Sequence, residues 1–331
     1  MDSESVSPNT RIGILAAIGN TPLLPLSRVS AGLSDPLLAK AEFLNPSGSI
    51  KDRMAIHLIE KAEKAGMLGP HSTIVECTSG NTGASLAMIC AIRGYRTILV
   101  CPDKVSDEKI QLLKLFGAEV VITPTDRPTN SPESYYATAR RIAAETPEAL
   151  FVDQLSHPDN VEAHYISTGP EIWEQTHGHV DCVVIGVGTG GTITGVGHYL
   201  KERNPNILVV AVDPVGSVFY DWFKKGRIGQ PATYLVEGIG DDILPQNLDF
   251  SVIDEILQVS DAECFHMARR LIAEEGIFVG GSSGGAVSAA LRFVGKRRTL
   301  STVVTLLPDS GFRYMSKSFS DAWMHAHGLS V

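Results

Sequence analysis

Lys51 stands where a lysine can act as a nucleophile. The segment NPSGSIKDR at residues 45–53 follows an apolar stretch, residues 37–44, that is typical of a mostly buried strand. Apolar residues then recur at helical spacing over residues 50–65, with Ser49 before them as a good N-cap. Lys51 therefore falls in the first helical turn, where exposed N–H groups and the helix dipole disfavour a cation. Desolvation acts in the same direction, so the side chain can be held as the neutral amine that attacks carbonyls. Taken alone, the position also fits an ordinary surface lysine.

The loop GVGTGGT at residues 186–192 has the composition of an anion site. It follows a predicted strand and opens a predicted helix, so its N–H groups and the helix N-terminus favour a phosphate. The loop also matches G-x-G-x-x-G, and Asp213 lies at about the spacing of a ribose-binding acid, so an NAD-dependent dehydrogenase is an alternative. Thr189 and Thr192 suit a terminal phosphate better than a bridging pyrophosphate. A purely structural turn is the remaining interpretation.

Two more loops carry hydroxyl groups at predicted helix starts. TSGNTG at residues 78–83 offers hydroxyls, an amide and bare N–H groups, which suits a carboxylate, although a capping turn would look the same. GGSSG at residues 280–284 matches G-x-S-x-G, and Asp309 with His325 or His327 follows in hydrolase order, so a serine hydrolase is a second alternative. Those histidines lie in a segment expected to be a surface tail. A lysine nucleophile, a phosphate site, a carboxylate site and a neutral hydroxyl together suit an amino acid and a phosphorylated carbonyl cofactor.

The elements that must position these loops alternate between strand and helix, which predicts parallel α/β sheets. In such sheets ligands bind at the carboxyl ends of the strands, where the candidate loops fall. The strands are predicted at residues 73–76, 97–101, 119–123 and 149–152 in a first series, and at 180–185, 207–213, 255–259 and 302–307 in a second. Helices are predicted at residues 84–93, 134–145 and 261–275, from 107 to about 117, and after the loops at 186–192 and 280–284; residues up to 250 after the strand at 207–213 are expected to be irregular.

Composition excludes several classes of function. The chain has 331 residues, 44% hydrophobic and 20% charged, with a net charge of −9 and no long basic run, so nucleic-acid and membrane partners are not expected. Five scattered cysteines without a C-x-x-C pair indicate buried thiols in a reducing compartment rather than disulfides or a zinc site. The polar N-terminus lacks the pattern of a signal peptide. We expect a cytoplasmic protein without a metal.

The order of these motifs resembles one enzyme family. GNTPLL, NPSGSIKDR, TSGNTG, GVGTGGT, VEGIG and LLPDSG occur here as in the fold-type II pyridoxal-phosphate enzymes of the cysteine synthase and cystathionine β-synthase family, over about residues 12–326. NSPES at 130–134, DPVGS at 213–217 and SDAWM at 320–324 are more similar to the catalytic core of cystathionine β-synthase. The resemblance implies two open-sheet αβα domains of the tryptophan synthase β-like architecture. Residues 12–44 and 156–326 would form the larger, cofactor-binding domain, residues 45–155 the smaller, substrate-binding domain, and residues 1–11 and 327–331 tails.

The resemblance also implies roles for particular residues. Lys51 would form the Schiff base with pyridoxal 5'-phosphate and later move the Cα proton, Asn81 would hydrogen-bond the phenolic oxygen, and Ser282 would face the pyridine nitrogen. The phosphate would be held by Gly188, Thr189, Gly190, Gly191 and Thr192, with Pro308 and Asp309 also bordering the cofactor. The amino-acid carboxylate would be bound by Thr78, Ser79, Thr82 and Gln154, and Glu237 and Gly238 would border the thiol substrate.

The implied reaction is β-replacement on L-serine or an O-activated serine by a thiol, through an aminoacrylate. Cystathionine formation from serine and homocysteine is the leading hypothesis; cysteine synthase and a specialised β-substituted alanine synthase are the alternatives. Leu155, where the family usually has an aromatic residue, and Asp241, where animal cystathionine β-synthases have tyrosine, bear on the second substrate. We expect a homodimer acting on small molecules. Haem sensing and adenosylmethionine activation are not expected.

Overall fold

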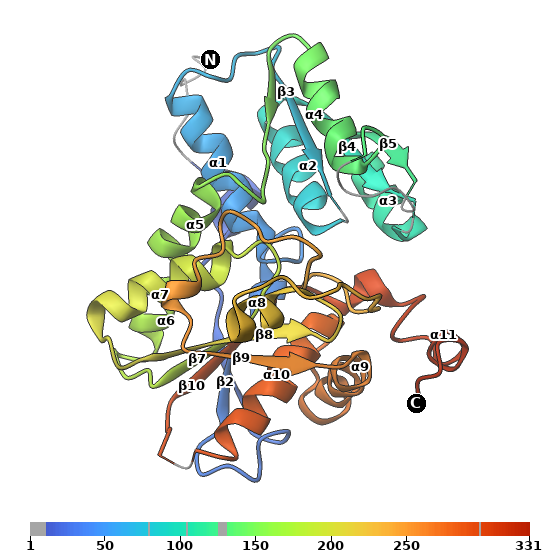
Figure 1. The fold of residues 1–331 in the computed structure, drawn as a ribbon. Coiled ribbons are helices and arrows are strands. Elements are labelled where there is room, and N and C mark those ends of the chain that lie inside the picture. The colour runs from blue at the N-terminus through green and yellow to red at the C-terminus, as the bar shows by residue number, and fades with distance from the viewer. Residues whose placement is uncertain (1–10, 79, 104, 125–130, 298) are drawn as a thin grey trace. The chain divides into compact units, whose positions relative to one another are not determined.

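The computed structural model describes residues 11–331 except 79, 104, 125–130 and 298, and it divides into two compact units (Figure 1). The first unit comprises the described residues of Met1–Ile18 and Asn45–Asn160; the second comprises Gly19–Leu44 and Val161–Val331. Residues 12–18 and 156–160, which the sequence analysis grouped with the larger domain, therefore cluster with the first unit. The roles expected of the two domains remain predictions.

A parallel four-stranded sheet forms the centre of the first unit. Its strand order is β5-β4-β3-β6, so β3 lies between two neighbours. The strands are β3 (Thr73–Cys77), β4 (Arg96–Pro102), β5 (Glu119–Thr123) and β6 (Ala149–Phe151). All five residues of β3 are buried, as expected of a strand covered on both faces.

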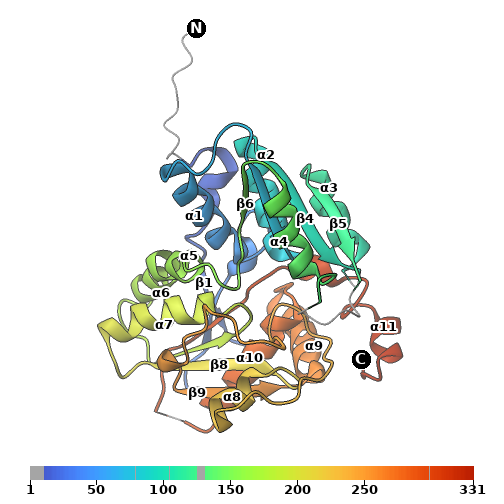
Figure 2. The same cartoon turned by 45° about the horizontal axis from the view of Figure 1, so that its top comes forward.

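Helices cover both faces of this sheet. They are α1 (Lys51–Lys64), α2 (Asn81–Arg93), α3 (Asp107–Leu115) and α4 (Tyr135–Glu145). Alternate strand residues divide between the faces: Leu99 and Cys101 pack in the cluster with α2 and α3, whereas Val75 and Val100 pack in the cluster with α4. Helix α1 packs against α2 (Figure 2). The two faces thus carry separate apolar clusters.

The second unit is built on a six-stranded sheet of order β1-β2-β10-β7-β8-β9. Only the β1–β2 pair is antiparallel; the other pairs are parallel. The strands are β1 (Leu23–Leu26), β2 (Leu37–Lys40), β7 (Cys182–Gly186), β8 (Leu208–Pro214), β9 (Glu255–Val259) and β10 (Val303–Leu306). The carboxyl end of β7 leads directly into the candidate loop at residues 186–192, and that of β10 leads to Pro308 and Asp309.

Helices and helical turns complete the chain. The α-helices after α4 are α5 (Asp159–Ala163), α6 (Gly169–Gln175), α7 (Gly191–Arg203), α8 (Phe219–Lys225), α9 (Asp261–Arg270), α10 (Gly281–Val294) and α11 (Asp321–Ala326). The π-helical turns are η3 (His164–Thr168) and η5 (Leu271–Glu275), and the 3₁₀ turns are η1 (Gly13–Ala17), η2 (Glu42–Leu44), η4 (Phe250–Val252) and η6 (Gly311–Tyr314). Helices α9 and α10 pack so closely at Gly284 that a Cβ there would lie 2.0 Å from the Cys264 carbonyl oxygen. No helix among the described residues is long and apolar enough to cross a membrane.

The predicted strands are confirmed to within two residues, with one exception. The strand predicted at 37–44 ends at Lys40 and continues as η2, because the Lys40 carbonyl accepts the Leu307 N–H and the Phe43 N–H then reaches back to the Leu307 carbonyl. The helices α5, α6, α8 and α11 were not predicted from the sequence. In residues 327–331, expected to be a tail, most side chains are exposed, although the His327 ring stacks on Trp323 and the partly buried Leu329 packs against the core.

Candidate active site

Lys51 is the first residue of α1, one position later than predicted. Ile50 occupies the N-cap position without a side-chain cap, and the Ser49 hydroxyl instead accepts the Lys51 backbone N–H at 3.3 Å. The neighbouring Asp52 carboxylate is fully buried and accepts the Ser47 N–H at 2.7 Å. This contact ties the turn before α1 to its first residues. Lys51 is therefore placed at the predicted helix start, on a turn fixed by its own polar groups.

The loop after β3 is shaped by Thr78. The Thr78 hydroxyl accepts the N–H groups of Gly80, at 3.0 Å, and Gly83, at 3.2 Å, and its side chain is buried. Asn81 then begins α2, and its carbonyl accepts the Ser85 hydroxyl at 3.1 Å. Ser85 also contacts the Ser47 hydroxyl at 3.1 Å, which links the loops before α1 and α2. The predicted Ser79 lies outside the described residues.

Gln154 joins this loop from the end of β6. The Thr82 hydroxyl donates to its Oε1 at 2.5 Å, and its Nε2 donates to the Cys77 carbonyl at 3.3 Å. Because that carbonyl can only accept, the amide orientation follows from the network. A weaker contact joins Nε2 to the Glu76 carboxyl oxygen at 3.5 Å. The structure thus brings together three residues expected to hold a carboxylate, Thr78, Thr82 and Gln154, and adds Glu76, which the sequence analysis missed.

The conformation of the loop between β7 and α7, residues 186–192, requires glycines. Gly190 adopts φ +85°, and a Cβ there would lie 2.6 Å from the Cα of Leu248. A Cβ on Gly188 would lie 2.8 Å from the Gly238 carbonyl oxygen. Neither position accepts a side chain without moving backbone. The glycines thus place backbone N–H groups without flanking side chains at the N-terminus of a 13-residue helix, which suits an anion.

A buried histidine contacts the first turn of the helix that follows this loop. His164, on η3, contacts the Thr192 hydroxyl through Nε2 at 3.1 Å and the Thr168 hydroxyl through Nδ1 at 2.8 Å. The ring is almost completely buried. These two contacts fix the Thr192 rotamer on the first turn of α7. His164 was not predicted as a site residue because nothing in the sequence around it marks its contact with Thr192, 28 residues away.

The start of α10 collects the predicted residues near the end of β10. The Ser282 side chain is buried, and its hydroxyl lies 3.8 Å from where a Cβ of Gly238 would be. The Asp309 carbonyl accepts the Gly280 N–H at 3.0 Å, while its carboxylate accepts the Tyr314 hydroxyl at 2.6 Å. Burial and the nearby Asp309 carboxylate raise the pKa of Tyr314 well above its usual value, so it stays a donor. Within the second unit, Gly188, Gly238 and Ser282 thus lie close to one another.

The VEGIG segment is held by polar contacts. Lys317 pairs with Glu237 at 2.7 Å, and the Val187 carbonyl accepts the Gly240 N–H at 2.7 Å. The Asp241 carboxylate turns back to accept the Asp242 N–H at 2.8 Å. Burial, with the adjacent Asp242 side chain, raises the pKa of Asp241 to about 7. Asp241 is therefore a local capping carboxylate as well as a neighbour of the predicted thiol site.

The residues required by the two alternative enzyme classes have other roles. Asp213 is completely buried and accepts the Tyr220 N–H at 2.9 Å, and burial raises its pKa to about 6, which does not suit an exposed ribose-binding acid. His325 is exposed on α11, and His327 contacts the Trp323 carbonyl. The Asp309 carboxylate bonds Tyr314, and only an isolated bridge precedes Gly280, instead of the strand of a nucleophile elbow. Neither the dehydrogenase nor the hydrolase arrangement is supported.

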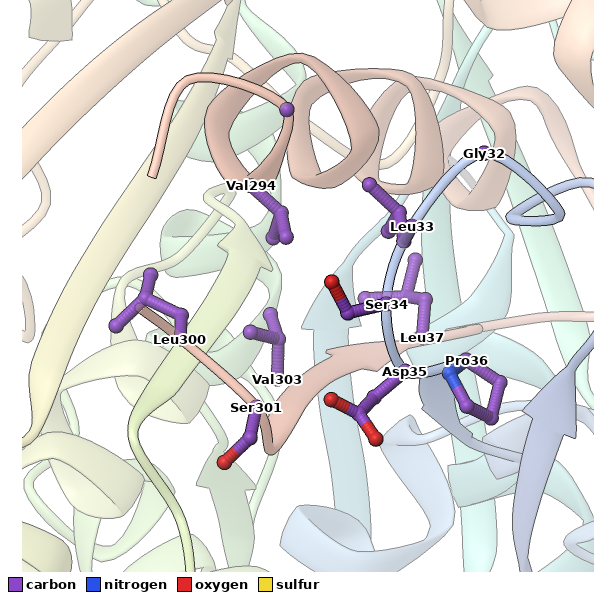
Figure 3. A pocket seen from close by; sticks show the side chains of 11 residues that line it. Gly32, Leu33, Ser34, Asp35, Pro36, Leu37, Val294, Leu300, Ser301 and Val303 are labelled. Atoms are coloured by element: carbon purple, nitrogen blue, oxygen red, sulfur yellow. The ribbon is translucent and has the colours of Figure 1, made fainter. Parts of the chain in front are cut away.

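A cavity of about 280 Å³ in the second unit lies elsewhere (Figure 3). Its lining includes Leu37 at the start of β2, Val303 at the start of β10 and Val294 at the end of α10. These are the amino ends of β2 and β10, whereas the loop at residues 186–192 follows the carboxyl end of β7, and Pro308 and Asp309 follow that of β10. The cavity is therefore separate from the predicted site.

The donor set fits pyridoxal phosphate. In the second unit, the crowded glycine turn at Gly188 and Gly190 leaves room only for backbone N–H groups at a helix start, which suits a phosphate. The buried Ser282 hydroxyl offers a neutral partner for a ring nitrogen. The amine expected to bind the cofactor, Lys51, lies in the first unit, at the start of α1. These residues would hold the cofactor.

Comparison with known proteins agrees with the fit of these residues to pyridoxal phosphate. A model of the family described as pyridoxal-phosphate dependent enzyme matches residues 14–309. Cystathionine beta-synthase of Apis mellifera is 45% identical over 96% of this chain and 63% of its own length, and that of Rattus norvegicus is 45% identical over 98% and 58%. Cysteine synthase 1 of Emericella nidulans is 40% identical over 96% of this chain and 87% of its own. The chain thus spans about six tenths of the first two relatives. It belongs to the family of pyridoxal-phosphate dependent enzymes.

Proposed function

We propose that this protein catalyses β-replacement, joining L-serine and homocysteine to give cystathionine and water. The observation that carries the proposal is the similarity, at 41–45% identity over nearly the whole chain, to proteins named cystathionine beta-synthase. The site residues support it, because they offer an amine, a phosphate site, a carboxylate site and a neutral hydroxyl.

Pyridoxal phosphate, when bound, withdraws electrons from the amino acid's Cα and so weakens its C–H bond. Lys51 would take the Cα proton on Nζ and return a proton to the departing hydroxyl, which leaves as water. Thr78, Thr82 and Gln154 would orient the carboxylate so that the Cα–H bond faces that amine. Ser282 would offer the ring nitrogen a neutral hydroxyl, which cannot supply the full charge of an aspartate.

Further residues would hold the cofactor and the thiol in place. Asn81 would bond the cofactor's phenolic oxygen, and Pro308 and Asp309 would border its ring. The phosphate would be held by Gly188, Thr189, Gly190, Gly191 and Thr192. Glu237 and Gly238 would border the incoming thiol; its sulfur would bond the β-carbon, and its proton would pass to Lys51 and from there to Cα. The Lys317 contact keeps the Glu237 side chain in a fixed rotamer.

Cysteine synthase is the second candidate. Proteins named cysteine synthase 1 from Emericella nidulans and Neurospora crassa are 40–41% identical to this chain, which covers 85–87% of their length. That coverage exceeds the 58–63% seen for the first two cystathionine beta-synthases. The leaving group would then be an O-acyl group, which departs without a proton donor.

A crossed assay separates the two candidates. The purified, cofactor-loaded protein is given serine or O-acetylserine, each with homocysteine or sulfide, and the thioether and cysteine products are measured. The proposal predicts cystathionine from serine and homocysteine at the highest kcat/KM. Cysteine from O-acetylserine and sulfide as the dominant product would favour cysteine synthase instead.

We further propose a cytoplasmic homodimer. All five cysteines are buried and unpaired as thiols, which suits a reducing compartment. Exposed apolar side chains occur on both units: Ile12 and Ile14 on the first, Leu44 and Ile166 on the second, each about half exposed. Such side chains suit an interface between copies. Light scattering would report the mass in solution.

A further inference from the structure

Glu76 is a carboxyl group buried beside the predicted carboxylate site. It is the fourth residue of β3, is completely buried, and is followed by the loop that holds Thr78 and Thr82. Its carboxyl oxygen lies 3.5 Å from Gln154 Nε2 and 3.7 Å from the Cys77 sulfur, and the backbone of Gln154 also hydrogen-bonds to it. Glu76 thus contacts Gln154 at both its backbone and its side chain.

The segment that carries Gln154 is constrained from the other side as well. Asp153 has φ +50°, in the left-handed region that few residues other than Gly, Asn and Asp adopt. Both of its carboxylate oxygens accept the Tyr136 hydroxyl at 3.0 Å, and its carbonyl accepts the Ser156 and His157 N–H groups. This turn sets the direction in which Gln154 leaves β6. The conformation of Asp153 therefore sets the backbone direction at Gln154, and Glu76 contacts the amide at the end of the Gln154 side chain.

The charges around Glu76 favour its neutral form. Burial, and then the Asp153 carboxylate, raise the pKa of Glu76 to about 8. The groups facing it are Asp153 after β6 and the Cys77 thiol on β3. Tyr136 reaches Asp153 from α4, with Arg140 over its ring at 5.6 Å. The other titratable residues of the elements packed on β3 are Arg96 and Cys101 on β4, Cys90 and Arg93 on α2, and Tyr135, Arg141 and Glu145 on α4.

We propose that Glu76 is a positioning residue for the amino-acid substrate: neutral, it holds the Gln154 amide beside Thr82, and ionised, it weakens substrate binding. Two effects act in the same direction. An ionised Glu76 attracts Gln154 Nε2 more strongly and draws the amide away from a substrate carboxylate. It also adds a negative charge in a buried setting near that carboxylate. This inference rests on the proposed function, because it requires a substrate carboxylate at Thr78, Thr82 and Gln154.

The sign of the pH effect follows. Below about pH 8 Glu76 is protonated and the substrate binds; above that pH it ionises and binding weakens. If the ionised form does not bind, the KM for the amino acid rises about tenfold per pH unit above the pKa, whereas kcat changes little. A residue that only stabilised β3 would not produce a pH dependence that is confined to KM.

The test measures KM and kcat for serine and for O-acetylserine from pH 6 to 9.5, with the equilibrium binding of each amino acid followed by cofactor absorbance. Glu76→Gln replaces the carboxyl by an amide of the same shape that stays neutral, so it is expected to abolish the rise in KM above pH 8. Asp153→Asn removes the neighbouring charge while Asn tolerates the positive φ, so the rise should move to lower pH. Glu60→Gln, a buried acid on α1 paired with Arg11, is the matched control and should leave the pH profile unchanged.

Infrared difference spectra supply a readout independent of turnover. The protein should show a protonated-carboxyl band that disappears near pH 8 and is absent in Glu76→Gln. A KM that still rises in Glu76→Gln, or a Glu76 band lost well below neutral pH, would overturn the inference. Failure of the proposed function looks different: neither amino acid would then change the cofactor spectrum of the wild-type protein at any pH.

Discussion

Replacing Gly190 by alanine tests whether the turn between β7 and α7 holds the cofactor phosphate. The new Cβ would face two penalties. At φ +85° an L-residue costs about 1–2 kcal/mol relative to glycine. In addition, the Cβ would lie 2.6 Å from the Leu248 Cα and 2.7 Å from its nitrogen, so backbone must move. Loss of even one charge-assisted N–H bond to the phosphate costs about 1.5–3 kcal/mol. We therefore expect cofactor affinity to fall about 10- to 100-fold.

Two matched variants separate strain from steric overlap. Gly226→Ala, at the end of α8, has φ +65° but no heavy atom within 4 Å of the new Cβ, so it should lower Tm by a few degrees and leave cofactor affinity unchanged. Gly188→Ala lacks the positive φ but meets the Gly238 carbonyl at 2.8 Å, so it should weaken cofactor binding. The assay titrates cofactor-free protein with pyridoxal phosphate by absorbance, alongside thermal unfolding. Wild-type affinity in Gly190→Ala would refute the assignment of the phosphate to this loop.

Two further substitutions follow from the site. Ser282→Asp should retain the cofactor but reduce kcat for β-replacement by orders of magnitude, because a carboxyl group at this buried position would keep the ring nitrogen protonated. An unchanged kcat in steady-state assays would show that Ser282 serves only in the first turn of α10. Asp241, whose raised pKa of about 7 makes it anionic only above neutral pH, should pair with the homocysteine ammonium, so the KM for homocysteine should fall as pH rises through 7. Asp241→Asn should remove that dependence and raise the KM for homocysteine more than for serine; equal changes in both would contradict it.

Much of the fold could be predicted because its signals are local. Each parallel strand is a short apolar run bounded by turn residues, and β5 and β9 were predicted to the residue. Helix α1 was predicted from its apolar spacing, although its start moved by one residue because Ser49 bonds the Lys51 N–H. Helices α6 and α8 were missed because each has seven residues, too few to show a period.

The site was predictable only where motifs mark it. Loops such as TSGNTG and GVGTGGT concentrate glycine and hydroxyl residues at helix starts, a pattern visible in one stretch of sequence. Glu76 and His164 carry no such mark, since each acts through a partner distant in the chain: Gln154 for Glu76 and Thr192 for His164. Asp241 was recognised, but its turn toward its own backbone depends on the conformation of residues 241–243.

Lys51 is proposed to hold the cofactor and to move protons during β-replacement. The most direct measurement is borohydride reduction of the cofactor-loaded protein followed by peptide mapping by mass spectrometry. We expect a single pyridoxyl-phosphate adduct on the peptide containing Lys51, and we expect the folded Lys51→Ala protein to lose both the adduct and turnover. An adduct on another lysine, or full activity of Lys51→Ala, would show that Lys51 does not have this role.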